Sequence, residues 1–156
     1  TGQFTGLPET AERLLHDDRL LMVFPEGARG TAKLYWERHS LVDFGTGFMR
    51  LAMKTRAPIV PVAILGGAEA LPTVANSVTL GHLMGAPYVP IPAYLAPVPL
   101  PVQMEVHYGA PMEFHGTGSE DDEVVHGHVD EVKRVIATTM RERLRALGRE
   151  PAEGLS

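Results

Sequence analysis

The residues best suited to chemistry form one short stretch, Phe24 to Gly30, with the sequence FPEGARG. Arg29 could hold a phosphate, because a planar guanidinium presents paired N–H donors that match phosphate oxygens. Gly27 and Gly30 have no Cβ and would let the backbone approach a ligand closely. Glu26 has no obvious direct role in anion binding, but it could orient Arg29 or accept from a substrate hydroxyl. From these residues alone, an ordinary turn with an exposed arginine is as good an interpretation as a phosphate-binding loop.

The charge around this stretch favours an anion site. The 156-residue chain has a formal net charge of -5, yet residues 29–56 contain six basic and two acidic side chains. A solvated loop and helix face would show the same excess. The overall negative charge argues against nucleic-acid binding, which needs clustered Lys and Arg. The absence of cysteine excludes a thiolate nucleophile and a thiolate metal site.

A short series of expected elements positions the stretch. The continuous apolar run 20–24 predicts a strand buried on both faces, preceded by a helix at 8–18. Residues 25–44 resemble a loop, followed by a helix at 45–55 and a strand at 59–65. This alternation predicts an α/β fold with a mixed, largely parallel sheet and flanking helices. Ligands bind at the carboxyl ends of strands in such sheets, which is where FPEGARG lies.

The second half of the chain predicts a strand at 102–108, a polar linker at 116–122 and a long helix at 123–147. We expect residues 1–156 to form a single domain. No metal site is expected. His126 and His128 are two positions apart and do not share a helix face, and the acidic residues before them suit a helix start.

Residues 70–104 contain no formally charged side chain. Seven prolines interrupt this segment and argue against a spanning helix. Its apolar and aromatic side chains, among them Leu95 and Val98, predict peripheral contact with a membrane surface. The alternative is that the segment folds inward and covers the sheet.

FPEGARG resembles the FPEG-x-R-S block of the phospholipid and glycerol acyltransferases, and the sequence PIVPV at 58–62 resembles their later VPV block. The likeness covers roughly residues 8–70. Ala28 stands where threonine is usual and Gly30 where serine is usual, so two hydroxyl donors are missing. The resemblance implies a substrate-binding site formed by Phe24, Pro25, Glu26, Gly27, Ala28, Arg29, Gly30, Val60 and Pro61.

Members of this family move a fatty acyl group from coenzyme A or acyl carrier protein to a hydroxyl of glycerol phosphate or a lysophospholipid. The resemblance therefore implies no cofactor beyond that thioester co-substrate, an acceptor lipid that bears phosphate, and a cytoplasmic protein peripheral to the membrane. The family's general base is a histidine followed five positions later by an aspartate, and this pair precedes the FPEG block.

No histidine in this chain has an aspartate five positions later, and His39 to Asp43 is one residue short. No catalytic residue is therefore assigned. Because the chain starts at Thr1 with no leader-like segment, we expect it to be the carboxyl-terminal portion of an acyltransferase domain, with a fold lacking its amino-terminal part. The alternative is a noncatalytic remnant that binds anionic lipid or serves regulation. A His-x4-Asp encoded within about a hundred residues upstream would favour the enzyme.

We expect the purified chain alone not to transfer acyl groups, because general-base catalysis typically contributes ~10² to 10⁴ in rate. Release of thiol from an acyl thioester, with and without acceptor, measures this. Acceptor-dependent thioester consumption clearly above that of the boiled chain would contradict the assignment.

Overall fold

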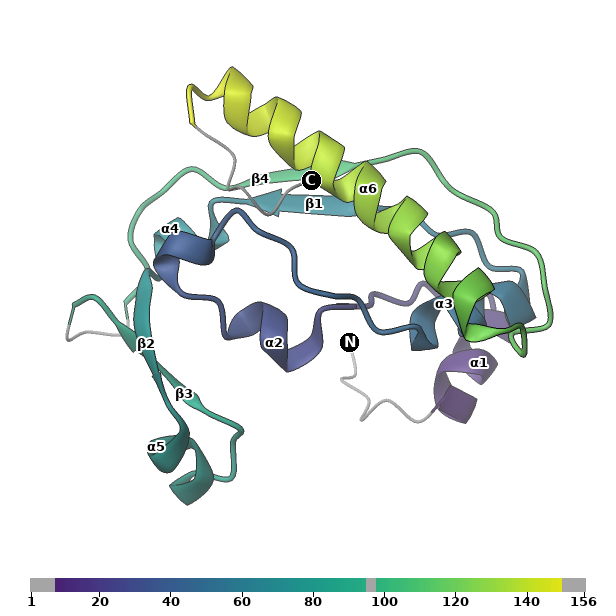
Figure 1. Ribbon diagram of the computed structural model, residues 1–156, viewed down its shortest axis with the longest axis horizontal. Helices are drawn as coiled ribbons and strands as arrows, with labels where there is room; N and C mark the ends of the chain where they lie inside the picture. Colours follow the sequence, from purple (N-terminus) through teal and green to yellow (C-terminus); the bar gives the residue numbers. More distant parts are fainter. Residues whose placement is uncertain (1–7, 95–97, 150–156) are drawn as a thin grey trace.

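The computed structural model describes residues 8–94 and 98–149, which form small helices and short strands around one long helix (Figure 1). The helices are α1 (Pro8–His16), α2 (Gly27–Thr31), the 3-10 turn η1 (Tyr35–Glu37), α3 (Gly47–Thr55), α4 (Gly67–Ala70), α5 (Val78–Leu83) and α6 (Asp122–Ala146). The strands are β1 (Val62–Leu65), β2 (Thr73–Ser77), β3 (Val89–Pro92) and β4 (Glu105–Tyr108).

Helix α6 is the long helix expected near the end of the chain, and its apolar residues recur every three or four positions. Acidic side chains start it and Arg143 and Arg145 lie in its last turn, as the helix dipole favours. Gly148 follows with φ of 66°, and Arg149 N donates to Leu144 O at 2.8 Å. The left-handed glycine therefore ends the helix as its position in the sequence indicated.

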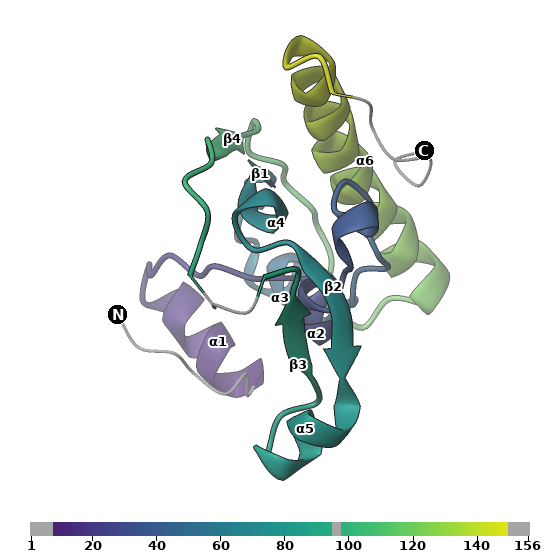
Figure 2. The ribbon, with the colours of Figure 1, turned by 90° about the vertical axis from the view of Figure 1, so that its left-hand side faces the viewer.

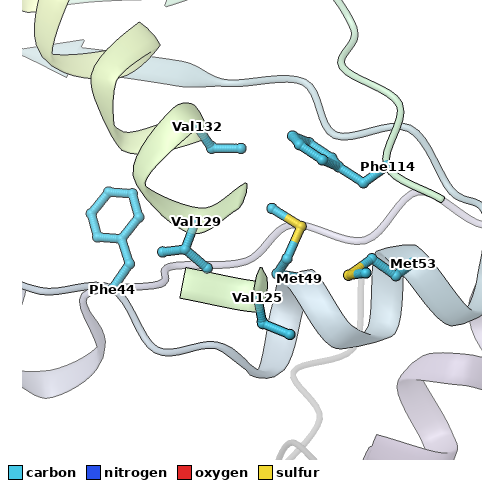
Figure 3. Packing of buried hydrophobic residues seen from close by; sticks show 7 residues of the cluster. All are labelled: Phe44, Met49, Met53, Phe114, Val125, Val129 and Val132. Carbon is cyan, nitrogen blue, oxygen red and sulfur yellow. The ribbon is translucent and has the colours of Figure 1, made fainter. Parts of the chain in front are cut away.

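The core is built along the apolar face of α6. Figure 3 shows one end of it, where α6 meets α3 and the two segments that lead into these helices. Its buried side chains are Phe44, Met49, Met53, Phe114, Val125, Val129 and Val132. Farther along α6, Met140 and Leu144 pack with Ala63 and Leu65 of β1. One helix thus joins both halves of the core.

Both sheets are antiparallel pairs, so the expectation of a largely parallel sheet was wrong. Strand β1 pairs with β4, with Val62 opposite Tyr108, and β2 pairs with β3. No parallel pair occurs between described residues. The mixed helix and strand content is as expected. A parallel pair needs two strands joined by a crossover, and the strand expected at 20–24, which would have supplied one partner, does not form.

Residues 20–24 form neither a strand nor a buried element, which corrects the second expectation. The exposed fraction is 98% for Leu20 and 69% for Phe24. An apolar run becomes a buried strand when neighbouring strands satisfy its backbone, and no described strand pairs with this segment. Residues 25–44, expected as loop, contain α2 and η1.

The uncharged segment forms a hairpin that extends away from α6 (Figures 1 and 2). Strands β2 and β3 are its arms, and α5 lies near its end. At that end Leu83 is 84% exposed and Met84 is 68% exposed. Leu95 lies outside the described residues, while Val98 is exposed. Within the described residues, no helix combines the length and apolar character needed to cross a bilayer.

Candidate functional site

The stretch FPEGARG folds as a turn that enters α2. Gly27 N donates to Phe24 O at 3.0 Å, and Gly27 has φ of 58°, a conformation that glycine adopts readily. Arg29 is exposed, and its Nη2 donates to the backbone O of Asp43 at 3.3 Å. A guanidinium has five N–H donors, so this bond orients Arg29 while leaving most of its binding capacity for a ligand.

Glu26 turns inward and binds Lys33, which lies beyond α2. Both carboxylate oxygens are 2.7 Å from Lys33 Nζ, and Oε1 also accepts from Val42 N at 2.9 Å. Lys33 Nζ donates to Ser40 O at 2.8 Å as well. The ammonium thus uses its three donors on one carboxylate and one backbone carbonyl. We call Glu26, Lys33 and the backbone of Ser40 and Val42 the Glu26–Lys33 knot.

The knot gives Glu26 a structural role that was not considered from the sequence. Its carboxylate bonds to Lys33 and Val42, and no hydrogen bond between described residues joins it to Arg29. The side chains of Glu26 and Lys33 are 18% and 14% exposed. Burial at this level makes loss of one partner costly, because the other charge stays partly desolvated. Glu26 therefore acts by holding residues 25–42 in shape.

The same contact explains why glycine stands at position 30. A Cβ built on Gly30 would collide with Oε2 and Cβ of Glu26. Neither atom can move freely, since Oε2 is bonded to Lys33. The serine usual in the acyltransferase block therefore does not fit here while Glu26 keeps its partners.

A second ion-pair cluster anchors the far end of the loop. His39 is buried, and its Nε2 lies 2.9 Å from Oε1 of Glu69 in α4. Arg38 and Arg149 approach the same oxygen at 3.7 and 3.4 Å. Burial raises the pKa of Glu69, but the hydrogen bond with His39, a backbone hydrogen bond and the charge of Arg149 outweigh it, so the pKa lies below its usual value.

The second predicted block lies apart from this loop in the hydrogen-bond network. Pro61 is buried and its O accepts from Gly109 N at 2.8 Å, while Val60 is exposed. The adjacent Ile59 pairs with Met112. No hydrogen bond between described residues joins Val60 or Pro61 to residues 24–30. Their expected part in substrate binding stays a prediction.

Comparison with known proteins supports the family resemblance of the FPEGARG stretch. The family model described as acyltransferase matches residues 4–65, which include the whole of FPEGARG. Over this range the chain is similar to the acyltransferase family. The matched range, called the acyltransferase segment below, contains α1, α2 and α3 and ends in β1. No solved structure matches the chain.

Similar full-length proteins are mycobacterial. An uncharacterized protein of Mycobacterium tuberculosis is 36% identical over 140 residues, which cover 83% of this chain and 39% of the relative. An uncharacterized protein of Mycobacterium leprae is 34% identical over 151 residues, which cover 89% of this chain and 41% of the relative. The chain thus spans about two fifths of the length of these curated relatives.

Lys33 is the residue of the acyltransferase segment that sequence reasoning missed. It was counted in the basic excess, but its pairing with Glu26 was not foreseen. The seven-residue spacing does not match the helical contacts three or four apart, and the short helix α2 lies between the two residues. The sequence did contain one signal for this pair: Glu26 is an acidic residue next to a basic stretch and has no obvious role in binding an anion.

We expect Lys33→Met to destabilise the fold by about 1–3 kcal/mol, between the values for exposed and fully buried pairs. Urea unfolding of Lys33→Met, Glu26→Gln and the double variant should give a coupling energy of about 1–3 kcal/mol. The matched control is Lys54→Met, because the Lys54–Glu12 pair has a similar distance of 2.8 Å but Lys54 is 55% exposed. Equal losses for Lys33→Met and Lys54→Met would contradict a structural role for the knot.

Proposed function

We propose that the protein containing this acyltransferase segment transfers a fatty acyl group from a thioester donor to a hydroxyl of a phosphate-bearing glycerolipid acceptor. The donor would be acyl-coenzyme A or acyl carrier protein, and the acceptor glycerol phosphate or a lysophospholipid. The observation that carries the proposal is the placement of Arg29. It is an exposed residue of α2, within the loop that the Glu26–Lys33 knot holds in one shape.

A fixed, exposed arginine suits an acceptor phosphate for two reasons. The guanidinium fork can bind two phosphate oxygens at once, which orients the acceptor as well as attracting it. The backbone bond to Asp43 limits the rotation of Arg29, so less conformational entropy is lost when the phosphate binds. Gly27, two positions before Arg29, has open space beside it, so a ligand can approach its backbone.

The chemistry of transfer requires a general base, and this sequence does not contain the His-x4-Asp pair that supplies it in the family. The acceptor oxygen would attack the thioester carbonyl while the base takes the hydroxyl proton, and the C–S bond would then break, so that the donor leaves as a thiolate that receives this proton from the base. In the family this base is the histidine of His-x4-Asp. The residues of this chain would therefore bind and orient the acceptor, and another part of the longer protein would supply the base.

The second candidate is a noncatalytic protein that binds anionic lipid. The missing His-x4-Asp favours it, and the same exposed Arg29 would serve it. Acyl transfer by the longer protein separates the two functions, because lipid binding alone consumes no thioester.

In the longer protein, Arg29→Ala should raise the KM for the acceptor at least about tenfold, since a bond to a charged partner contributes roughly 1.5–3 kcal/mol. The KM for the donor should change little. Arg29→Lys should recover part of the loss, because it keeps the charge without the fork. Arg145→Ala is the control, as Arg145 is exposed on α6. Unchanged acceptor KM and kcat in both Arg29 variants would exclude this role.

We also propose that the hairpin β2–α5–β3 contacts the membrane surface from which the lipid acceptor comes. The support is its exposed apolar end at Leu83 and Met84 and its lack of formal charge. Asn76 Nδ2 of β2 donates to Ala32 O at 2.6 Å, which ties the hairpin to the chain directly after α2. A lipid held at the hairpin would therefore lie near the loop that carries Arg29.

The double variant Leu83→Asp/Met84→Asp should bind vesicles containing phosphatidic acid at least about tenfold more weakly, because two apolar side chains would no longer enter the lipid boundary. Co-sedimentation measures binding, and circular dichroism checks the fold. Val124→Asp is the matched control, since Val124 is 47% exposed on α6. Undiminished binding by the folded double variant would remove the membrane role of this hairpin.

A further inference from the structure

A groove of about 560 Å³ lies along α6, beside the segment that contains Leu41. Its volume is in the range of small-molecule sites. Three cationic side chains and one acidic side chain line it, together with apolar atoms of Leu41 and Ala137. The cations are Lys133, Arg134 and Arg141, and the acid is Asp130.

The helical repeat places these cations on one side of α6. Lys133, Ala137 and Arg141 are four residues apart and therefore follow one another along the helix. Arg134 lies beside Lys133 and one turn beyond Asp130. The groove carries an excess of two positive charges, although the chain as a whole has a net charge of -5.

Two of the cations have no charge partner in the part of the chain that the structure describes. Lys133 Nζ lies 3.5 Å from Oδ1 of Asp43, a largely exposed carboxylate. Arg134 and Arg141 make no ion pair with any described residue. In addition, Nε of Arg141 is buried without a hydrogen-bond partner. A buried donor without an acceptor is costly, and an anion in the groove would supply one.

Asp43 connects the groove to the candidate acceptor site. Its side chain approaches Lys133 in the groove, and its backbone O accepts the hydrogen bond from Arg29. The neighbouring Phe44 packs against Val129 and Val132, so this segment is fixed to α6 (Figure 3). Asp43 therefore contacts one cation of each site.

We propose that this groove binds the phosphate groups of the thioester donor. The inference rests on the proposed function for the identity of the ligand. Coenzyme A and the prosthetic group of acyl carrier protein share a phosphate ester of pantetheine; in coenzyme A this phosphate is one half of a diphosphate, and the ribose carries a third phosphate. Arg29 would bind the phosphate of the acceptor, and the groove would bind the phosphates of the donor. The two substrates would then be held next to each other.

The test is binding by the purified chain, which does not require catalysis. Titration calorimetry with coenzyme A, inorganic pyrophosphate and glycerol 3-phosphate compares the chain with Arg134→Gln/Arg141→Gln. We expect the double variant to bind coenzyme A and pyrophosphate at least about tenfold more weakly. Glycerol 3-phosphate should be unaffected by this variant and weakened by Arg29→Ala. Arg145→Gln, which removes a cation of α6 outside the groove, is the matched control.

Three outcomes would overturn the proposal: no binding of coenzyme A or pyrophosphate at millimolar concentration, equal losses in the double variant and in Arg145→Gln, or weaker glycerol 3-phosphate binding in the double variant. The last outcome would assign the groove to the acceptor. Failure of the proposed function looks different. In that case the groove would bind coenzyme A as expected while the longer protein transfers no acyl group.

Discussion

Burial of the apolar face of α6 is the constraint on which the rest of the structure depends. Val125 and Leu144, near its two ends, have no exposed surface. Burying one such side chain is worth roughly 1.5–3 kcal/mol. The same face packs against α3 at one end and β1 at the other, with Leu41 contacting both clusters. The position of the site loop relative to the sheet therefore follows from this one helix.

Electrostatic contacts then decide the shape of the loop between Pro25 and Phe44. Its length of about twenty residues would leave many conformations open, and ordering each residue costs roughly 1–2 kcal/mol. The Glu26–Lys33 knot near its start and the His39–Glu69 contact near its end offset part of that cost. Both use partly buried charges, which hold geometry better than exposed pairs do. Arg29 is placed by these contacts rather than by any bond of its own to the core.

Apolar surface also remains outside the core, and two separate stretches contribute to it. Residues 20–24 expose Leu20 and Phe24, and the hairpin exposes Leu83 and Met84. Exposed apolar groups that gather together mark surfaces for contact with other molecules or membranes. The cationic groove on α6 differs from both, because its charge selects an anionic ligand.

The sequence by itself determined the features that depend on neighbours along the chain. The 3.6-residue period showed α6 and α3, the prolines excluded a spanning helix at 70–104, and FPEGARG indicated the acyltransferase family and Arg29. Tertiary structure alone decided the features that depend on distant partners. A run such as LLMVF becomes a strand when other strands pair with it, and Val62 pairs with Tyr108 across 46 positions. Likewise, Glu26 pairs with Lys33 rather than Arg29, and Asp43 pairs with Lys133 of α6. These pairs depend on which charged side chains the fold brings close together.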